Sequence, residues 1–139
     1  MLRLVVCCGG GMSSSVLSKK FQDLIQENHW QDQVSVAYQP FTLLSKQQEN
    51  YDLALLCPHS VYTAKDLIKK GVITIPVYII PAQLYGSMKP ELLLEDAIDI
   101  LDIYHDTKMN PLHFPHEDFL ERKRNTSHRR WVKLHPYKE

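Results

Sequence analysis

The chain has 139 residues, a mean hydropathy of −0.29, and 16 basic against 16 acidic residues, so its formal net charge is zero. This length suits one domain with a sizeable core, and the composition is that of a soluble globular protein. No apolar run is long enough to span a bilayer, and the start of the chain lacks the pattern of a cleaved signal peptide. Three cysteines, an odd number, predict no disulfide framework and favour the cytoplasm.

The first predicted element is an apolar strand that leads into a loop rich in glycine and serine. Leu2 to Val6 forms the strand, Cys7 and Cys8 follow it, and a helical pattern covers about 13–28. Glycines allow backbone N–H groups to turn toward one point, and the first turn of a helix adds more N–H groups and a positive dipole end. We therefore predict an anion-binding loop formed by Gly9, Gly10, Gly11, Met12, Ser13, Ser14 and Ser15.

Cys8 is the predicted catalytic residue at the rim of this loop. A thiol beside a helix N-terminus and converging amides ionises more easily than a free one. Its thiolate can attack phosphorus while the amides stabilise charge on the phosphoryl oxygens. The alternative is a buried, inert cysteine followed by an ordinary connecting turn.

Three better-known loops do not fit these residues. A dinucleotide fingerprint requires glycine where Ser14 stands, and a P-loop requires a lysine directly after its last glycine, whereas the next lysine is Lys19. A thioredoxin-like motif requires two residues between its cysteines, and Cys7 and Cys8 are adjacent.

The rest of the chain alternates between strands and helices up to about residue 103. Strands are predicted at 34–38, 52–57 and 76–81, a helix runs from Val61 to the glycine stop at Gly71, a loop covers 82–89, and the last helix begins at Pro90. Residues 42–50 are compatible with a short helix or a turn. This order predicts a four-stranded parallel sheet with helices on both faces, an α/β fold that binds ligands beyond the carboxyl ends of its strands.

We expect residues 1–105 to form this domain and residues 106–139 to form a basic, histidine-rich extension. The extension is expected to be irregular or partly helical, with one possible helix at 114–123. Its basic clusters are 122–124 and 129–131. One interpretation is contact with an acidic partner, nucleic acid or a membrane surface. The interpretation that we prefer is a solvated or loosely packed extension. His113 and His116 are interpreted as surface residues because no cluster of further ligands accompanies them, so no metal site is predicted.

The motif Cys-x-x-Gly-Met-Ser-Ser-Ser, from Cys8 to Ser15, resembles the enzyme IIB component of the lactose/cellobiose family of the bacterial sugar phosphotransferase system. The similarity continues over about the first 103 residues, through Tyr51-Asp52-Leu53-Ala54-Leu55-Leu56-Cys57-Pro58, Pro76-Val77 and Leu84-Tyr85-Gly86. The chain departs from the family pattern at Gly9, Gly10, Cys57 and Pro81.

The resemblance implies a cytoplasmic phosphocarrier that associates with a membrane transporter. Cys8 would accept a phosphoryl group from a phosphohistidine on a IIA component. It would then pass the group to a sugar bound by the membrane IIC component, of the β-glucoside or disaccharide class such as cellobiose, chitobiose or lactose. Residues 9–15 would hold the phosphoryl group. We expect no cofactor, no nucleic acid and a monomer.

Two alternatives remain open at this stage. Low-molecular-weight tyrosine phosphatases use a similar loop with Cys-x5-Arg, but Ser14 stands at the arginine position, which favours transfer over hydrolysis. The second is a non-catalytic redox or phosphorylation sensor on the same fold. If the first and third strands are neighbours, Cys8 and Cys57 could form a regulatory disulfide. A buried, inert Cys57 is the simpler interpretation.

Overall fold

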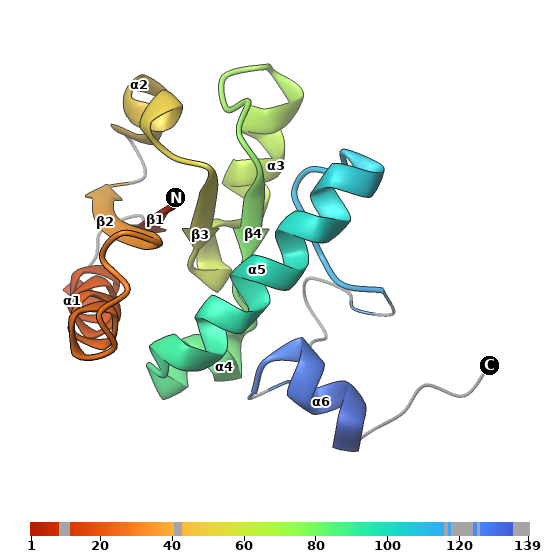
Figure 1. Ribbon diagram of the computed structural model, residues 1–139. Helices are drawn as coiled ribbons and strands as arrows, with labels where there is room; N and C mark the ends of the chain where they lie inside the picture. Colours follow the sequence, from red (N-terminus) through yellow and green to blue (C-terminus); the bar gives the residue numbers. More distant parts are fainter. Residues whose placement is uncertain (9–11, 41–42, 116, 118–123, 125, 135–139) are drawn as a thin grey trace.

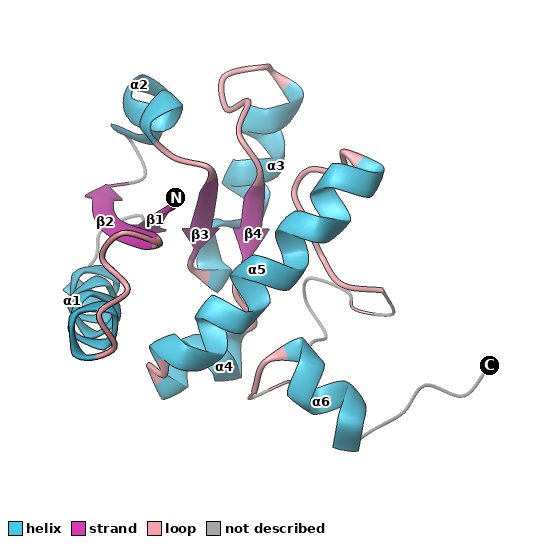
Figure 2. Ribbon diagram, in the orientation of Figure 1, coloured by secondary structure: helices cyan, strands magenta, loops and turns pink. Residues whose placement is uncertain are grey.

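The computed structural model describes residues 1–8, 12–40, 43–115, 117, 124 and 126–134, with the backbone alone for residues 8 and 12–14 (Figure 1). Four strands form one sheet in the order β2-β1-β3-β4. Their bounds are β1 Leu2–Cys8, β2 Val34–Pro40, β3 Leu53–Leu56 and β4 Val77–Ile79 (Figure 2). All three strand pairs are parallel, as the alternation of strands and helices predicts.

Helices cover both faces of the sheet, so the fold has the predicted three layers. Helices α1 (Met12–Glu27) and α5 (Pro90–Thr107) pack on one face, and α2 (Leu44–Gln47) and α3 (Val61–Lys69) on the other. Even-numbered positions of β1, such as Leu4 and Val6, belong to the core beneath α1 and α5, whereas Val5 and Cys7 belong to the opposite core. Central strands buried on both faces explain why β1 and β3 are almost uninterrupted apolar runs.

Most predicted elements are confirmed with small shifts at their ends. The ambiguous segment 42–50 contains α2 and a 3-10 helix, η2 (Gln48–Asn50), among its described residues. Helix α3 is followed by Gly71, whose φ of 76° lies in the left-handed region that favours glycine. Pro90 occupies the first turn of α5, as predicted.

The prediction of a loop at 82–89 is wrong. Residues Ala82–Ser87 form a short helix, α4, that begins after Pro81, and the Tyr85 N–H donates to the Pro81 carbonyl oxygen at 2.8 Å. A helix this short has little stability of its own, but Leu84 and Tyr85 are buried in the core beneath α1 and α5. Tertiary packing therefore decides its conformation.

The helix expected at 114–123 is also not supported. Residues 114, 115 and 117 are not helical, and residues 116 and 118–123 lie outside the described residues. A helix that the sequence analysis missed, α6, covers His128–Leu134 and lies beside α5 (Figure 1).

The chain beyond α5 packs along the edge of the sheet. The Leu112 N–H donates to the Val77 carbonyl oxygen at 2.7 Å, and the Val77 N–H donates to the Asn110 side-chain oxygen at 2.8 Å. Leu112 and Phe114 are almost fully buried. Because β4 is an edge strand, these contacts occupy backbone groups that would otherwise be open to another chain.

A buried guanidinium ties this segment to α5 and β4. Arg124 is 1% exposed and donates to Asp96 Oδ2 at 2.7 Å, to the Tyr78 hydroxyl at 2.8 Å and to both carboxylate oxygens of Glu117 at 2.7 and 3.0 Å. The Tyr78 hydroxyl in turn donates to Asp96 Oδ2 at 2.8 Å. We call these four residues the Arg124 cluster. Burial lowers the pKa of Arg124, but the partners around it raise that pKa by more, so the guanidinium remains charged.

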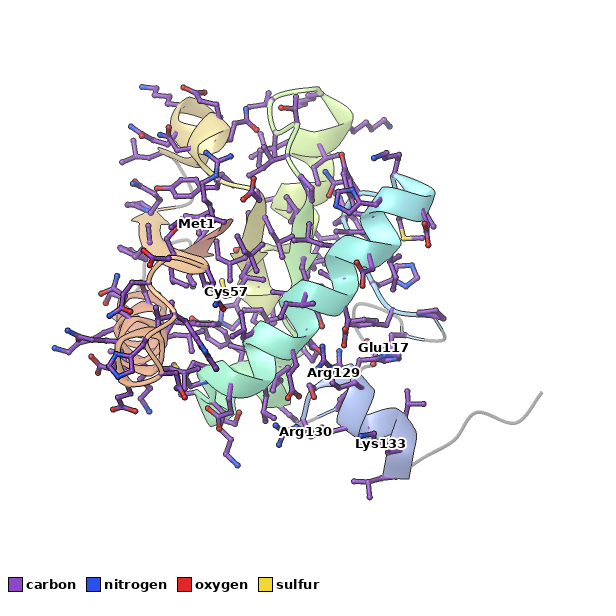
Figure 3. The ribbon with its side chains drawn as sticks, viewed as in Figure 1. Met1, Cys57, Glu117, Arg129, Arg130 and Lys133 are labelled. Atoms are coloured by element: carbon purple, nitrogen blue, oxygen red, sulfur yellow. The ribbon has the colours of Figure 1, made fainter. Side chains whose placement is uncertain are left out.

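Two further arginines hold α6 against α5. Arg129 pairs with Asp99 at 2.8 Å and Arg130 with Glu95 at 2.8 Å, and both lie on the side of α6 that faces α5 (Figure 3). The preferred expectation of a solvated or loosely packed extension is therefore wrong for the described residues. Arg124, Arg129 and Arg130 pair with acids of the same chain, because opposite charges attract. Their partners on α5 are Asp96, Asp99 and Glu95. Arg122 and Lys123 lie outside the described residues.

Candidate functional site

The candidate site lies where the carboxyl ends of the strands meet. Cys8 is the last residue of β1, one of the two inner strands, and its Cα is paired with that of Pro40 in β2. After β1 the chain forms β2 on one side of it, and then crosses to form β3 and β4 on the other side. The strand order therefore changes direction between β1 and β3. In open parallel sheets this switch point is where ligands bind.

Helix α1 begins four residues after Cys8, at Met12. The first N–H groups of a helix have no partner within it, and together with the helix dipole they favour an anion. The first turn of α1 contains no acidic residue that would compete with such an anion. Leu17, Phe21 and Ile25 are buried along one side of α1 and anchor its direction relative to the sheet.

The predicted phosphate-binding residues are only partly within the described chain. Gly9, Gly10 and Gly11 lie outside the described residues. Met12, Ser13 and Ser14 are placed by their backbone in the first turn of α1, and Ser15 follows them in the same helix with an exposed side chain. The Cys8 side chain also lies outside the described parts. Its role and that of residues 9–15 stay predictions.

The neighbouring segment at this edge follows β3. Cys57 is 1% exposed and precedes a 3-10 helix, η3 (Pro58–Ser60), from which α3 continues. The Cys57 N–H donates to the Cys7 carbonyl oxygen at 3.3 Å, and Cys57 Sγ lies 3.2 Å from Ser60 Oγ. His59 is exposed. The loop after β3 therefore lies directly beside the end of β1.

The third segment at this edge follows β4. The Ile80 N–H donates to the Leu56 carbonyl oxygen at 2.9 Å, which holds the start of this segment against β3. Neither this segment, Ile80-Pro81-Ala82-Gln83, nor the one after β3, Cys57-Pro58-His59-Ser60, contains an aspartate or glutamate. These two segments therefore supply no carboxylate to activate a water molecule.

A buried group of charges that no local sequence pattern predicts joins α5, β4 and the C-terminal segment. Asp96, in the middle of α5, is fully buried and accepts hydrogen bonds from Arg124 and from the His128 N–H. No local pattern predicts this pairing, because 28 residues separate Asp96 from Arg124. Within the described part of the chain, no three His, Cys, Asp or Glu side chains are grouped so as to hold a metal ion.

Comparison with known proteins agrees with this arrangement. The family model described as "PTS system, Lactose/Cellobiose specific IIB subunit" matches residues 3–96. The chain therefore belongs to the lactose/cellobiose-specific IIB family of the phosphotransferase system, whose domains are in general phosphotransferases. The match ends at residue 96, within α5, so two residues of the Arg124 cluster, Glu117 and Arg124, lie beyond it.

Two solved structures share the fold. The lactose-specific IIB component domain of the phosphoenolpyruvate:carbohydrate phosphotransferase system from Streptococcus pneumoniae aligns with a TM-score of 0.56 at 18% identity, over 70% of this chain and 95% of that chain. The cellobiose-specific phosphotransferase IIB component protein from Borrelia burgdorferi aligns with a TM-score of 0.52 at 25% identity, over 70% of this chain and 89% of that chain. The search of curated proteins gives no match. Among the described residues, no helix is both long and apolar enough to cross a bilayer.

Proposed function

We propose that this protein is a phosphocarrier in which Cys8 accepts a phosphoryl group from a phosphohistidine of a IIA component and passes it to a sugar bound by a membrane IIC component. The observation that carries the proposal is the position of Cys8. It ends an inner strand at the switch point of the sheet, four residues before the start of α1, in a chain of the IIB family.

In the first step, the Cys8 thiolate attacks the phosphorus of the phosphohistidine in line with the leaving nitrogen. The S–P bond forms as the N–P bond breaks, and the imidazole nitrogen keeps the electron pair of the broken bond. Charge spreads over the three equatorial oxygens during transfer. The backbone N–H groups of residues 9–15 and the positive end of α1 would stabilise that charge.

In the second step, a sugar hydroxyl attacks the same phosphorus. The O–P bond forms, the S–P bond breaks, the hydroxyl proton is released to water, and Cys8 returns to the thiolate. Between the steps the thiophosphate must survive in water. Ser14 in place of an arginine clamp, and the lack of aspartate and glutamate in 57–60 and 80–83, are consistent with such a lifetime. We propose a sugar of the β-glucoside or disaccharide class, as in cellobiose, chitobiose or lactose.

The test is intact-protein mass spectrometry after incubation with phosphoenolpyruvate, the general phosphotransferase proteins and a phosphorylated IIA component of the lactose/cellobiose class. We expect the wild type to gain one phosphoryl group and Cys8→Ser to gain none. The matched control is Cys7→Ala, which changes the adjacent cysteine on the opposite face of β1 and should gain the group like the wild type.

The proposal would be overturned if the wild type gained no phosphoryl group from IIA components shown to be phosphorylated, or if the group remained in Cys8→Ser. Rapid turnover of aryl phosphates by the wild type would instead support the phosphatase alternative. Fold stability, checked by thermal unfolding, separates loss of the nucleophile from loss of structure.

A further inference from the structure

The strand register brings the positions of Cys8 and Cys57 together. β1 and β3 are adjacent and parallel, and their last paired residues are Cys7 and Leu56. The next position on each strand is Cys8 on β1 and Cys57 after β3, and the Cys57 N–H donates to the Cys7 carbonyl oxygen at 3.3 Å. Neighbouring strands lie about 4.8 Å apart, a spacing within the window of roughly 4.4–6.8 Å between Cα atoms that a disulfide requires.

The two positions also belong to the same face of the sheet. Cys57 has an extended backbone, with φ −65° and ψ 156°, so the alternation of β3 continues through it. It is buried in the core that contains Leu4 and Val6 of β1 and Leu55 of β3. Position 8 is the next even position of β1 after 4 and 6, which is the series that meets this core.

Cys7 provides an internal comparison. It is only one position away from Cys57 in the strand register, but it is buried in the core on the opposite face, with Val5 and Leu56. The sheet backbone lies between Cys7 and Cys57. Of the two adjacent cysteines, only position 8 therefore shares a face with Cys57.

From this juxtaposition we propose that Cys8 and Cys57 form a reversible disulfide that switches the protein off under hydroperoxide stress. The inference rests on the proposed role of Cys8 as the phosphoryl acceptor. Cys8 is the residue that reacts first, and buried Cys57 is the resolving thiol, which needs access only to Cys8. A disulfide removes the nucleophile, so no phosphoryl group can be accepted until the bond is reduced.

The chemistry is balanced with hydrogen peroxide as the oxidant. The Cys8 thiolate attacks one peroxide oxygen, the O–O bond breaks, the departing hydroxide takes up a proton to become water, and Cys8 becomes a sulfenic acid. Cys57 sulfur then attacks Cys8 sulfur, the S–S bond forms, the S–O bond breaks, and hydroxide leaves with the Cys57 proton as a second water. Two thiols lose two electrons in total, and one peroxide gains them.

Ser60 is placed to assist the second step. Its hydroxyl lies 3.2 Å from Cys57 Sγ, and the residue as a whole is 7% exposed. As a donor, this hydroxyl stabilises negative charge on the attacking sulfur. We therefore expect Ser60→Ala to form the disulfide more slowly than the wild type while reaching the same product.

The experiment treats the purified, reduced full chain with hydrogen peroxide, blocks remaining thiols by alkylation under denaturing conditions, and maps tryptic peptides by mass spectrometry. Trypsin releases Cys7 and Cys8 together in peptide 4–19 and Cys57 in peptide 47–65. We expect these two peptides to be linked, and the link to disappear with dithiothreitol. Cys7→Ala should retain the link, whereas Cys8→Ser should lose it.

Cys57→Ala gives the functional arm of the test. Without the resolving thiol, peroxide should drive Cys8 to the sulfinic acid, which dithiothreitol does not reverse. Phosphoryl acceptance should therefore return after reduction in the wild type and stay lost in Cys57→Ala. Recovery in both proteins, absence of the linked peptide in the wild type, or its absence in Cys7→Ala would overturn the inference.

Failure of the proposed function would look different. In that case the reduced wild type would accept no phosphoryl group from IIA. The peptide link is measured without any partner protein, so its presence or absence does not depend on that result.

Discussion

The carboxyl edge of the sheet around Cys8 and the Arg124 cluster are built by different kinds of interaction. At the edge, β1 ends at Cys8 and α1 begins at Met12, so the parts of the proposed site are near neighbours in the chain. In the Arg124 cluster, 28 residues separate Arg124 from Asp96 and 46 separate it from Tyr78, and the contacts are between side chains.

The two regions also treat charge differently. The first turn of α1 and the segments 57–60 and 80–83 contain no carboxylate, as expected if this edge holds the phosphoryl group proposed above. In the cluster, the charges of Asp96 and Glu117 are matched by Arg124 from the same chain. We therefore assign the cluster to permanent packing and propose that the edge accommodates a transient anion. Four measurements test this separation.

The largest effect is expected from Arg124→Met. It leaves Asp96, which is fully buried, without its cationic partner, and breaking a buried ion pair from one side costs about 3–5 kcal/mol of unfolding free energy. Urea unfolding monitors the loss. Phosphoryl acceptance per folded molecule should be unchanged.

The matched control for this variant is Lys133→Met, which removes an exposed positive charge from the same segment and should leave stability nearly unchanged. A loss of stability under 1 kcal/mol in Arg124→Met, by the scale of an exposed pair, would contradict the structural role of the cluster.

Tyr78→Phe should have a smaller effect. It deletes a buried hydroxyl that donates to Asp96 and accepts from Arg124, while the direct contact between Arg124 and Asp96 remains. We expect a loss of about 1–2 kcal/mol. In a double-mutant cycle with Arg124→Met, the two losses should be less than additive, because both variants remove the same contact. Full additivity would show that the hydroxyl acts independently of the cluster.

The packing of the C-terminal segment should also depend on pH. His128 stacks on Phe114 with ring centroids 4.1 Å apart. Burial lowers the pKa of His128; the negative charge of Glu117 raises it, and the positive charge of Arg124 lowers it further. The unfolded chain therefore binds a proton first as pH falls. Unfolding free energy should decline below about pH 6.5, by no more than about 1 kcal/mol for this half-buried group.

The check is to measure urea unfolding at several values between pH 8 and pH 5.5 for the wild type and for His128→Phe, which keeps the ring stacking. The decline should be smaller in the variant. An identical decline in both proteins would assign the pH dependence to other groups.

The smallest effect is expected from Arg129→Met. Its guanidinium pairs with Asp99 at 2.8 Å, but the Arg129 side chain is 44% exposed, and exposed pairs contribute about 0–1 kcal/mol. The remaining contribution should weaken further in high salt, because salt screens exposed charges. A loss as large as that of Arg124→Met would mean that α6 is held by its surface pairs rather than by the buried arginine.

Much of the fold and part of the candidate site could be predicted from the residues themselves. The four strands, α1, α3, the start of α5 at Pro90 and the position of Cys8 at a strand end all follow from local periodicity and from glycine and proline signals. These features depend on neighbours in the chain, so a short window of sequence contains what is needed. The roles of residues 9–15 stay predictions.

The C-terminal segment and α4 were decided by tertiary structure. In the sequence, a basic residue such as Arg124 looks the same whether water or a buried carboxylate surrounds it, and Leu84 and Tyr85 do not show which helix will cover them. Only the folded domain brings the Asp96 carboxylate and the Tyr78 hydroxyl together and excludes water from them. Arg124 can then pair with both in a buried environment, where charge pairing is strong. Local sequence patterns thus suffice for the parallel sheet and for the strand end that holds Cys8. Long-range desolvation and charge pairing decided that the basic end of the chain packs on the domain.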